Sequence, residues 1–261
     1  FLDEQLFEEF LKNQQKTSEK IDFVSICSPN FLHAKHIEMA LTNGADAICE
    51  KPLVLYPEDI ERLERVQAET GHKVYNVLQL RLHETIIALR NRILAGDPNK
   101  TYDIDLTYIT SRGKWYHQSW KGDRSKSGGV ATNIGIHFFD MLSWIFGEVK
   151  SSTVHAYEDD KAAGFLQLER ARVRWYLSLD SNDIPAEAVA KGMRTYRSIT
   201  IEGEEIEFSE GFTTLHTDTY RHILSGQGFG LEIAKPCILL THELRNLTPI
   251  GKVGDYHPFL T

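Results

Sequence analysis

The chain has 261 residues, 41% of them hydrophobic, which suits one large or two ordinary globular domains with a substantial core. Asp and Glu outnumber Lys and Arg by 37 to 29, and the formal charge of -8 argues against a general nucleic-acid or membrane surface. Cys27, Cys49 and Cys237 form no C-x-x-C pair, so reduced thiols are favoured over a disulfide framework or a zinc site.

The ends of the chain carry no recognisable targeting segment. No apolar run has the length of a membrane span, and no secretory signal pattern opens the sequence, so we expect a cytoplasmic protein. The first residue is Phe1 rather than Met, which leaves a processed or truncated piece of a longer protein as an open alternative.

Residues 1–80 alternate helical and strand patterns, which predicts a parallel sheet covered by helices. Ser28, Pro29 and Asn30 close the first strand and can cap the helix that follows. The expected helices span residues 4–13, 30–44 and 57–71, and the expected strands span residues 21–27, 45–49 and 72–80.

Residues 81–261 have a different pattern, in which alternating strands joined by turns predict a second, mostly antiparallel sheet. The sequence GQGFG at 226–230 follows a helical segment and has the wrong spacing for a dinucleotide-binding loop, so we interpret it as a turn between the last two helices. The expected strands span residues 101–110, 151–158, 164–169, 172–180 and 197–208, and the expected helices span 83–96, 133–147, 214–225 and 231–247.

Glu50, Lys51 and Pro52 directly follow the predicted strand at 45–49. In open α/β sheets, ligands bind at the carboxyl ends of the strands, and these three residues are predicted to lie there. A strand that is ended by proline, with a solvated lysine beside it, would have the same sequence.

The predicted helix at 133–147 carries a polar stripe. Asn133, His137, Asp140 and Trp144 recur at steps of four, three and four, which places them on one helix face. The alternative is a core-facing histidine that is satisfied by its neighbours.

Residues 112–126 form a basic loop with five Lys or Arg residues against Asp123 alone, a local charge of +4. Lys and Arg supply charge-assisted hydrogen bonds to phosphate or carboxylate, and Trp115, Tyr116 and Trp120 offer ring faces to a base or sugar. The loop therefore suits a small anionic ligand, while an ordinary solvated basic loop remains the alternative.

Three segments together resemble the Gfo/Idh/MocA oxidoreductase family: SICSPNFLHAKHIEMAL, CEKPL and GGVATNIGIHFFDML. Within it, NVLQLRLHETI, WYHQSWKGDRSKSGGVATNIGIH and TYRSITIEGEEIEFSEGFTTLHTDTY are most similar to the UDP-N-acetylglucosaminuronate 3-dehydrogenases of the WlbA/WbpB type. The resemblance implies an α/β fold: a partial Rossmann domain at 1–80 that carries NAD, and a second α/β domain at 81–261 built on a large, open, mostly antiparallel sheet. That sheet packs in homo-oligomers of the family, commonly tetramers.

The resemblance also implies functional residues. Lys51 and His137 are the expected catalytic pair, in a family whose EKP proline commonly follows a cis peptide bond, and no metal is expected. The expected cofactor-binding residues are Ser28, Pro29, Asn30, His33, Glu50, Lys51, Pro52 and Gln79. The expected substrate-binding residues are Arg81, Tyr116, Gln118, Trp120, Lys121, Arg124, Asn133 and His137.

The implied reaction is NAD-dependent oxidation of C3 of a UDP-N-acetylglucosaminuronate-type sugar, for surface polysaccharides such as lipopolysaccharide. Ordinary pKa values near 6.5 for His and 10.4 for Lys favour His137 as the base, with charged Lys51 stabilising the developing alkoxide. Burial of Lys51 beside a cationic nicotinamide would lower its pKa and exchange the two roles.

Two departures from the family leave alternatives open. The family begins with a strand, a glycine loop and a second strand, and this chain starts beyond them, so we expect weak NAD binding unless about 55 preceding residues are added. Asn133 stands where many relatives have Asp. Another sugar or inositol dehydrogenase of the family, use of NADP in place of NAD, and a non-catalytic interaction protein without the glycine loop remain alternatives.

Overall fold

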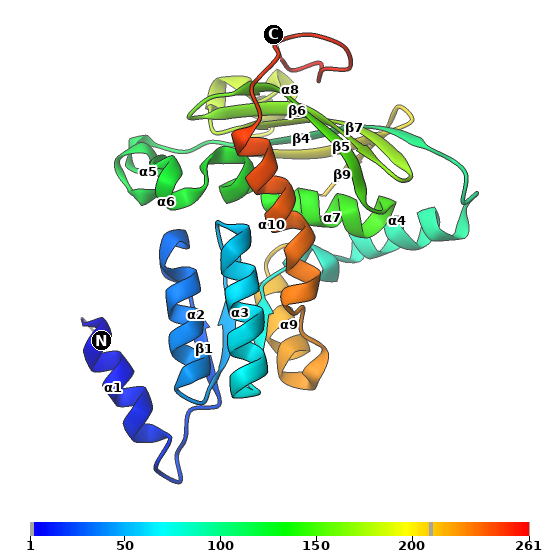
Figure 1. Cartoon of the computed structure of the whole chain (residues 1–261). Coiled ribbons are helices and arrows are strands. Elements are labelled where there is room, and N and C mark those ends of the chain that lie inside the picture. The colour runs from blue at the N-terminus through cyan, green and yellow to red at the C-terminus, as the bar shows by residue number, and fades with distance from the viewer. Residues whose placement is uncertain (1–2, 209–210, 261) are drawn as a thin grey trace.

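The computed structural model, which describes residues 3–208 and 211–260, contains two sheets with helices packed against them (Figure 1). The smaller sheet has the order β1-β2-β3, with both pairings parallel, as the alternating pattern predicts. Its strands are β1 (Phe23–Ile26), β2 (Asp46–Cys49) and β3 (Val74–Asn76). The helices of this region are α1 (Glu4–Gln14), α2 (His33–Thr42) and α3 (Pro57–Thr70), and a short 3-10 turn, Asn30–Leu32, precedes α2.

Strand β3 is shorter than the predicted strand at 72–80. Cys49 pairs with Asn76, and the amide of Val77 still donates to the Cys49 carbonyl at 3.0 Å. The chain leaves β2 after Cys49, so residues 77–80 have no strand to pair with. Gln79 instead begins a 3-10 helix, Gln79–Leu82. The apolar Leu80 is buried within this helix.

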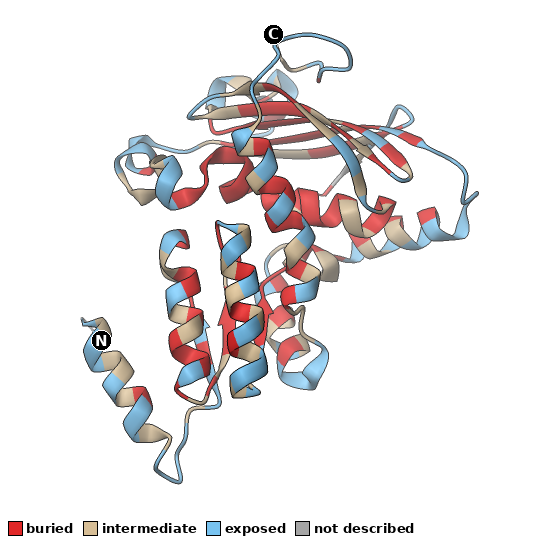
Figure 2. Cartoon of the chain, in the orientation of Figure 1, coloured by how far each residue is buried: buried red, intermediate tan, exposed pale blue. Residues whose placement is uncertain are grey.

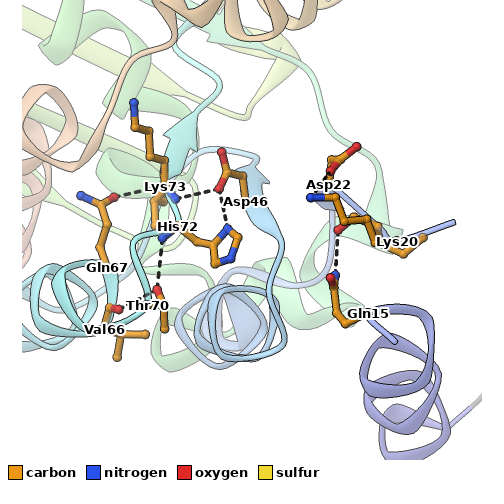
Figure 3. Close-up of polar contacts among 11 residues, drawn as sticks. Gln15, Lys20, Asp22, Asp46, Val66, Gln67, Thr70, His72 and Lys73 are labelled. Atoms are coloured by element: carbon orange, nitrogen blue, oxygen red, sulfur yellow. Dashed lines mark hydrogen bonds and ion pairs between the residues drawn. The ribbon is translucent and has the colours of Figure 1, made fainter. Parts of the chain in front are cut away.

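The amino edge of the smaller sheet is held together by local polar contacts (Figure 3). The Asp46 carboxylate accepts a hydrogen bond from the Lys73 amide at 2.9 Å and lies 3.1 Å from His72 Nδ1. Gln67 Oε1 accepts from the Val74 amide at 3.0 Å. These contacts fix the turn between α3 and β3 against the start of β2, so the EKP segment leaves the sheet at the opposite edge.

The larger sheet has six strands in the order β5-β6-β7-β4-β8-β9. Only the β4–β7 pairing within it is parallel, so the expectation of a mostly antiparallel sheet is confirmed. Its strands are β4 (Tyr102–Thr110), β5 (Val149–Tyr157), β6 (Lys161–Leu168), β7 (Ala171–Ser178), β8 (Thr195–Ile201) and β9 (Glu204–Glu207).

The single strand predicted at 197–208 is a hairpin. Glu202 and Gly203 have φ values of 51° and 83°, the positive pair that a tight two-residue turn requires. The chain therefore reverses between β8 and β9.

One face of the larger sheet holds the main core. Helices α4 (Glu84–Ala95) and α7 (Ile136–Phe146) pack beneath it, and Figure 2 shows the buried residues concentrated along this contact. Trp175, Phe139 and Phe146 are among its largest fully buried side chains. A π-helical turn, Ala131–Gly135, leads into α7, so the helix predicted at 133–147 has two parts.

The opposite face is partly covered by a 3-10 turn, Ser181–Asp183, helix α8 (Ala186–Ala190) and the C-terminal segment (Figure 1). The basic loop lies beside the sheet as α5 (Lys114–Gln118), a 3-10 turn at Trp120–Gly122 and α6 (Arg124–Ser127). No helix in the described parts of the chain is long and apolar enough to cross a membrane.

The last helices return to the smaller sheet. They are α9 (Leu215–His222), its π-helical continuation Ile223–Gln227, and α10 (Leu231–Asn246). The turn predicted at 226–230 does join them. Ala234, Cys237 and Ile238 of α10 pack in one core with residues of α2 and α3. The division between residues 80 and 81 stays a prediction, and the core of the smaller sheet also draws on the C-terminal part of the chain.

Candidate active site

The carboxyl edge of the smaller sheet contacts the segment that leads into α7. Asn30, in the loop after β1, donates to the Ser127 carbonyl at 2.9 Å and to Asn133 Oδ1 at 3.3 Å. Lys51, just after β2, donates through Nζ to the Asn133 carbonyl at 2.7 Å. The parallel strand ends and the second sheet's helical layer thus meet at Asn133.

Lys51 and His137 line one cavity of about 190 Å³ at this junction. Both side chains are half-buried. The other polar lining residues include Glu50, Gln79, Arg112 and Arg197. Two residues far apart in the chain therefore face a common small space, and the Lys51–Pro52 peptide is cis.

The cavity lowers the pKa of both groups. Burial lowers the pKa of Lys51 to about 8, against the attraction of Glu50 and with the help of the Lys121 and Arg112 charges. Burial also holds the pKa of His137 well below its usual value, and the neighbouring Lys51 charge lowers it further. At pH 7 His137 is therefore neutral, and Lys51 is mostly protonated.

His33 joins the two loops at the strand ends. Its Nδ1 lies 2.8 Å from the Pro52 carbonyl, and its Nε2 lies 2.8 Å from the Ser28 carbonyl. Burial lowers the pKa of this fully buried ring. Among the predicted cofactor residues, His33 is thus engaged with backbone, and Ser28 Oγ lies 2.8 Å from His36 Nδ1.

Some of the predicted substrate-binding residues in the basic loop lie close to this junction. The Tyr116 hydroxyl accepts a hydrogen bond from Asn133 Nδ2 at 2.6 Å, which fixes the buried tyrosine beside Lys51's backbone partner. Lys121 Nζ lies 5.5 Å from the ring centroid of Trp120 and 5.4 Å from that of Trp115. Burial and Arg112 lower the pKa of Lys121.

Other predicted substrate residues lie outside the cavity of Lys51 and His137. Arg81 forms a paired contact with the buried Asp140, at 2.9 Å through Nε and 2.8 Å through Nη2, and lines a separate cavity of about 620 Å³. Arg124 Nε lies 3.2 Å from Asp159 Oδ1. Gln118 is exposed at the end of α5. Their substrate roles stay predictions.

The polar stripe predicted on the helix is divided between these two sites. His137 faces the cavity that it shares with Lys51. Asp140 instead pairs with Arg81, whose guanidinium carbon lies 5.4 Å from the ring centroid of Trp144. Asn133 lies on the π-helical turn and contacts Tyr116 and Asn30.

Arg197 is a cavity residue that is missing from the predicted set. It stands on β8 opposite Tyr108 of β4. A signal for it exists in the sequence, because Arg197 is in phase with the buried Ile199 and Ile201 and therefore shares their side of the strand. His216 of α9 is also missing from that set, and its Nε2 lies 3.3 Å from Glu50 Oε1 at the cavity wall.

Two buried polar atoms test whether the cavity suits a nicotinamide. Gln79 Oε1 and His137 Nδ1 are buried without a hydrogen-bond partner in the described part of the chain. Both residues line the cavity at the carboxyl edge of a parallel sheet, where dinucleotides bind in folds of this type. A carboxamide that enters the cavity would donate to Gln79 Oε1 and leave His137 Nδ1 to a substrate, so the residues present fit the nicotinamide end of NAD.

The chain matches two domain models of one family, in order. Residues 3–77 match the oxidoreductase family's NAD-binding Rossmann fold, and residues 96–240 match its C-terminal alpha/beta domain. These matches confirm the expected fold class and its Rossmann-type sheet.

Solved structures agree with the domain matches. The WlbA (WbpB) dehydrogenase from Thermus thermophilus, in complex with NAD and alpha-ketoglutarate, is 50% identical with a TM-score of 0.96, covering 100% of this chain and 84% of that one. The same dehydrogenase in complex with NAD and UDP-GlcNAcA is 49% identical with a TM-score of 0.94, covering 99% of this chain and 83% of that one.

A curated relative, the D-glucoside 3-dehydrogenase of Escherichia coli, is 30% identical over 145 residues. That match covers 53% of this chain and 40% of the relative, so it spans less than half of the relative's length. Because models of both family domains match along one chain, and the C-terminal model alone spans more than half of it, this protein belongs to the Gfo/Idh/MocA family of oxidoreductases.

Proposed function

We propose that this protein is an NAD-dependent dehydrogenase that oxidises C3 of UDP-N-acetylglucosaminuronate or a close relative of it, in the supply of sugars for surface polysaccharides such as lipopolysaccharide. The observation that carries the proposal is the shared cavity of Lys51 and His137. The Thermus thermophilus structure with NAD and UDP-GlcNAcA supports the choice of cofactor and substrate.

Oxidation of a secondary alcohol requires a base for the hydroxyl proton. NAD, when bound, accepts the hydride. His137 is neutral at pH 7 because burial lowers its pKa, so its free ring nitrogen can accept the proton. Lys51 is mostly protonated at pH 7, and its ammonium can orient the hydroxyl and stabilise the developing negative charge on oxygen.

The residues that would hold the nicotinamide end of NAD surround that pair. Gln79 offers an unpaired buried oxygen, Glu50 borders the cavity, and the backbone loop from Ser28 to Asn30 follows the neighbouring strand. His33 would act through position, because it holds the Ser28 and Pro52 carbonyls in place. Tyr116, Lys121 and Asn133 would face the sugar nucleotide from the second domain.

We also propose that copies of this chain associate through the outer face of the larger sheet, in a homotetramer. Phe165 on β6 is half-buried on that face, next to Arg172. The described cysteines are all free thiols, which suits the reducing cytoplasm as the place of the reaction.

A direct test is to supply the complete gene product with NAD and separate sugars, and to follow NADH formation. We expect turnover with UDP-N-acetylglucosaminuronate and a product that has lost two hydrogens by mass spectrometry. Turnover on inositol or a simple glucoside, with no activity or binding for the nucleotide sugar, would instead favour another dehydrogenase of the family. Binding without turnover on any of these sugars would support a non-catalytic protein.

A further inference from the structure

Arg197 contacts two aromatic rings at the wall of the cavity of Lys51 and His137. Its guanidinium carbon lies 4.3 Å from the ring centroid of Phe212 and 5.1 Å from that of Tyr108. Tyr108 is its cross-strand neighbour on β4, so the strand pairing itself sets one of the two rings. Cation–π contacts involve the face of the guanidinium and leave its planar edge available to a ligand.

Arg197 has no carboxylate partner among the described residues, in contrast to other arginines nearby. Arg81 is paired with Asp140, and Arg124 is paired with Asp159. Arg112, which lines the same cavity, also has no ion pair within the described ranges. The half-buried charge of Arg197 is costly unless an anion compensates it, and the exposed Arg112 adds a second positive charge at the cavity, so the cavity is suited to an anionic group.

The size of the cavity restricts which anion can reach Arg197. The reacting hydroxyl must lie at Lys51 and His137, and the cavity of about 190 Å³ that these residues share with Arg197 suits a sugar ring rather than a whole nucleotide. The group that meets Arg197 must then belong to the reacting ring. The diphosphate leads from C1 of that ring to the nucleotide, which the cavity does not hold, so it is left to the basic loop outside.

We propose that Arg197, assisted by Arg112, forms a subsite for a carboxylate carried by the reacting sugar ring. The planar guanidinium matches a carboxylate with two parallel hydrogen bonds, and a neutral hydroxymethyl group cannot use it in that way. This inference rests on the proposed function, because it assumes that a nucleotide sugar enters the cavity. It extends that function, because Arg197 of β8 would select uronates over neutral sugars.

Calorimetric binding of two ligands that differ only at this group tests the subsite. UDP-N-acetylglucosaminuronate and UDP-N-acetylglucosamine are titrated into the complete protein and into Arg197→Met, Arg197→Lys and Arg92→Met, with NADH in fixed excess so that no hydride transfer occurs. Met keeps an apolar stem between the two rings, Lys keeps the charge without the fork, and Arg92 is a surface residue of α4 whose nearest ion-pair contact is 3.8 Å long.

We expect Arg197→Met to weaken binding of the uronate roughly 10- to 100-fold, the effect of losing a charge-assisted contact, and to leave the neutral sugar nearly unchanged. Arg197→Lys should lose less, and Arg92→Met should keep the original preference. Thermal unfolding of each variant checks that the fold is intact.

Equal losses for both sugars, or an unchanged preference in a folded Arg197→Met protein, would overturn the subsite while leaving the proposed function standing. Failure of the unaltered protein to bind either nucleotide sugar would reject the proposed function itself, and the subsite with it. Succinate provides a further arm: if Arg197→Met loses binding of this free dicarboxylate but keeps its preference for the uronate, the site serves a separate acid and the proposal is wrong.

Discussion

Lys51 and His137 influence one another because both lie in the same half-buried cavity. A positive charge on one group raises the free energy of protonating the other, so the pair holds one proton in preference to two. Burial contributes most to both pKa shifts, and the Lys51 charge lowers the pKa of His137 further. This arrangement suits a base beside a cation that binds the same hydroxyl.

The first prediction concerns the dependence of kcat/KM on pH. With His137 as the base, activity should rise as pH increases through the lowered pKa of His137, below its usual value near 6.5. With Lys51 needed as a cation, activity should fall as pH increases through about 8, where Lys51 loses its proton. Lys51→Arg keeps the charge and should remove the alkaline fall. A profile that instead rises through about pH 8 would exchange the two roles.

The second prediction concerns the two residues as a unit. His137→Asn keeps a hydrogen-bond donor but loses the base, and Lys51→Met keeps an apolar stem but loses the cation, so each should lower kcat strongly. His137→Asn should have little effect on NAD affinity. If each group works only through the other, the double variant should be hardly slower than the poorer single variant. Steady-state kinetics of the three proteins decides this, and near-normal turnover in either single variant would contradict the assignment.

At the scale of elements, the basic loop is not uniform. Lys121 lies against two tryptophan rings, and its charge lowers the pKa of Lys51 in the cavity. Arg124 instead contacts Asp159 and the ring of Tyr157. The two ends of the loop therefore differ in how much charge they can offer to a ligand.

We predict that Lys121→Ala and Arg124→Ala raise KM for UDP-N-acetylglucosaminuronate more than they lower kcat. Loss of one charge-assisted contact should cost about 1.5–3 kcal/mol, and the larger effect should belong to Lys121 because Arg124 is already paired. Steady-state kinetics with varied substrate measures both. An unchanged KM in both variants would show that the loop is an ordinary solvated surface.

At the scale of the whole molecule, the larger sheet presents one face to α4 and α7 and the other outward (Figure 1). The C-terminal segment and α8 cover part of the outer face, where the buried His257 stacks on Tyr176 at a centroid distance of 5.6 Å. The rest of that face carries half-buried side chains such as Phe165 and Arg174. A second copy of the chain is our proposed cover for it.

We predict that Phe165→Glu weakens self-association, because a charge would be placed in the proposed contact between sheets. Light scattering coupled to size exclusion should show a lower mass than for the unaltered protein. Leu94→Glu is the matched control, since Leu94 is exposed on α4, away from the outer face. Loss of mass in both variants, or in neither, would contradict association through this face.

Local sequence was sufficient to place Lys51 and His137 on their own elements. The alternation of helices and strands placed Lys51 at a strand's carboxyl end, and the helix period placed His137 on a polar face, because short-range sterics and hydrogen bonding set both periods. The local pattern predicted too long a strand at 72–80, because β3 ends where its partner β2 ends. It also predicted one strand at 197–208, where the chain forms the β8–β9 hairpin with Glu202 and Gly203 in the turn.

Only the tertiary structure decided which charges are available. Three arginines lie in segments that resemble the family. Arg81 is paired with Asp140 and Arg124 with Asp159. Arg197 instead contacts aromatic rings. An arginine's role depends on whether a carboxylate lies within a few ångströms of it, and its partner here is distant in the chain. Sequence periodicity assigns a side chain to a face of its own element, but the group that it meets is determined by how the elements pack.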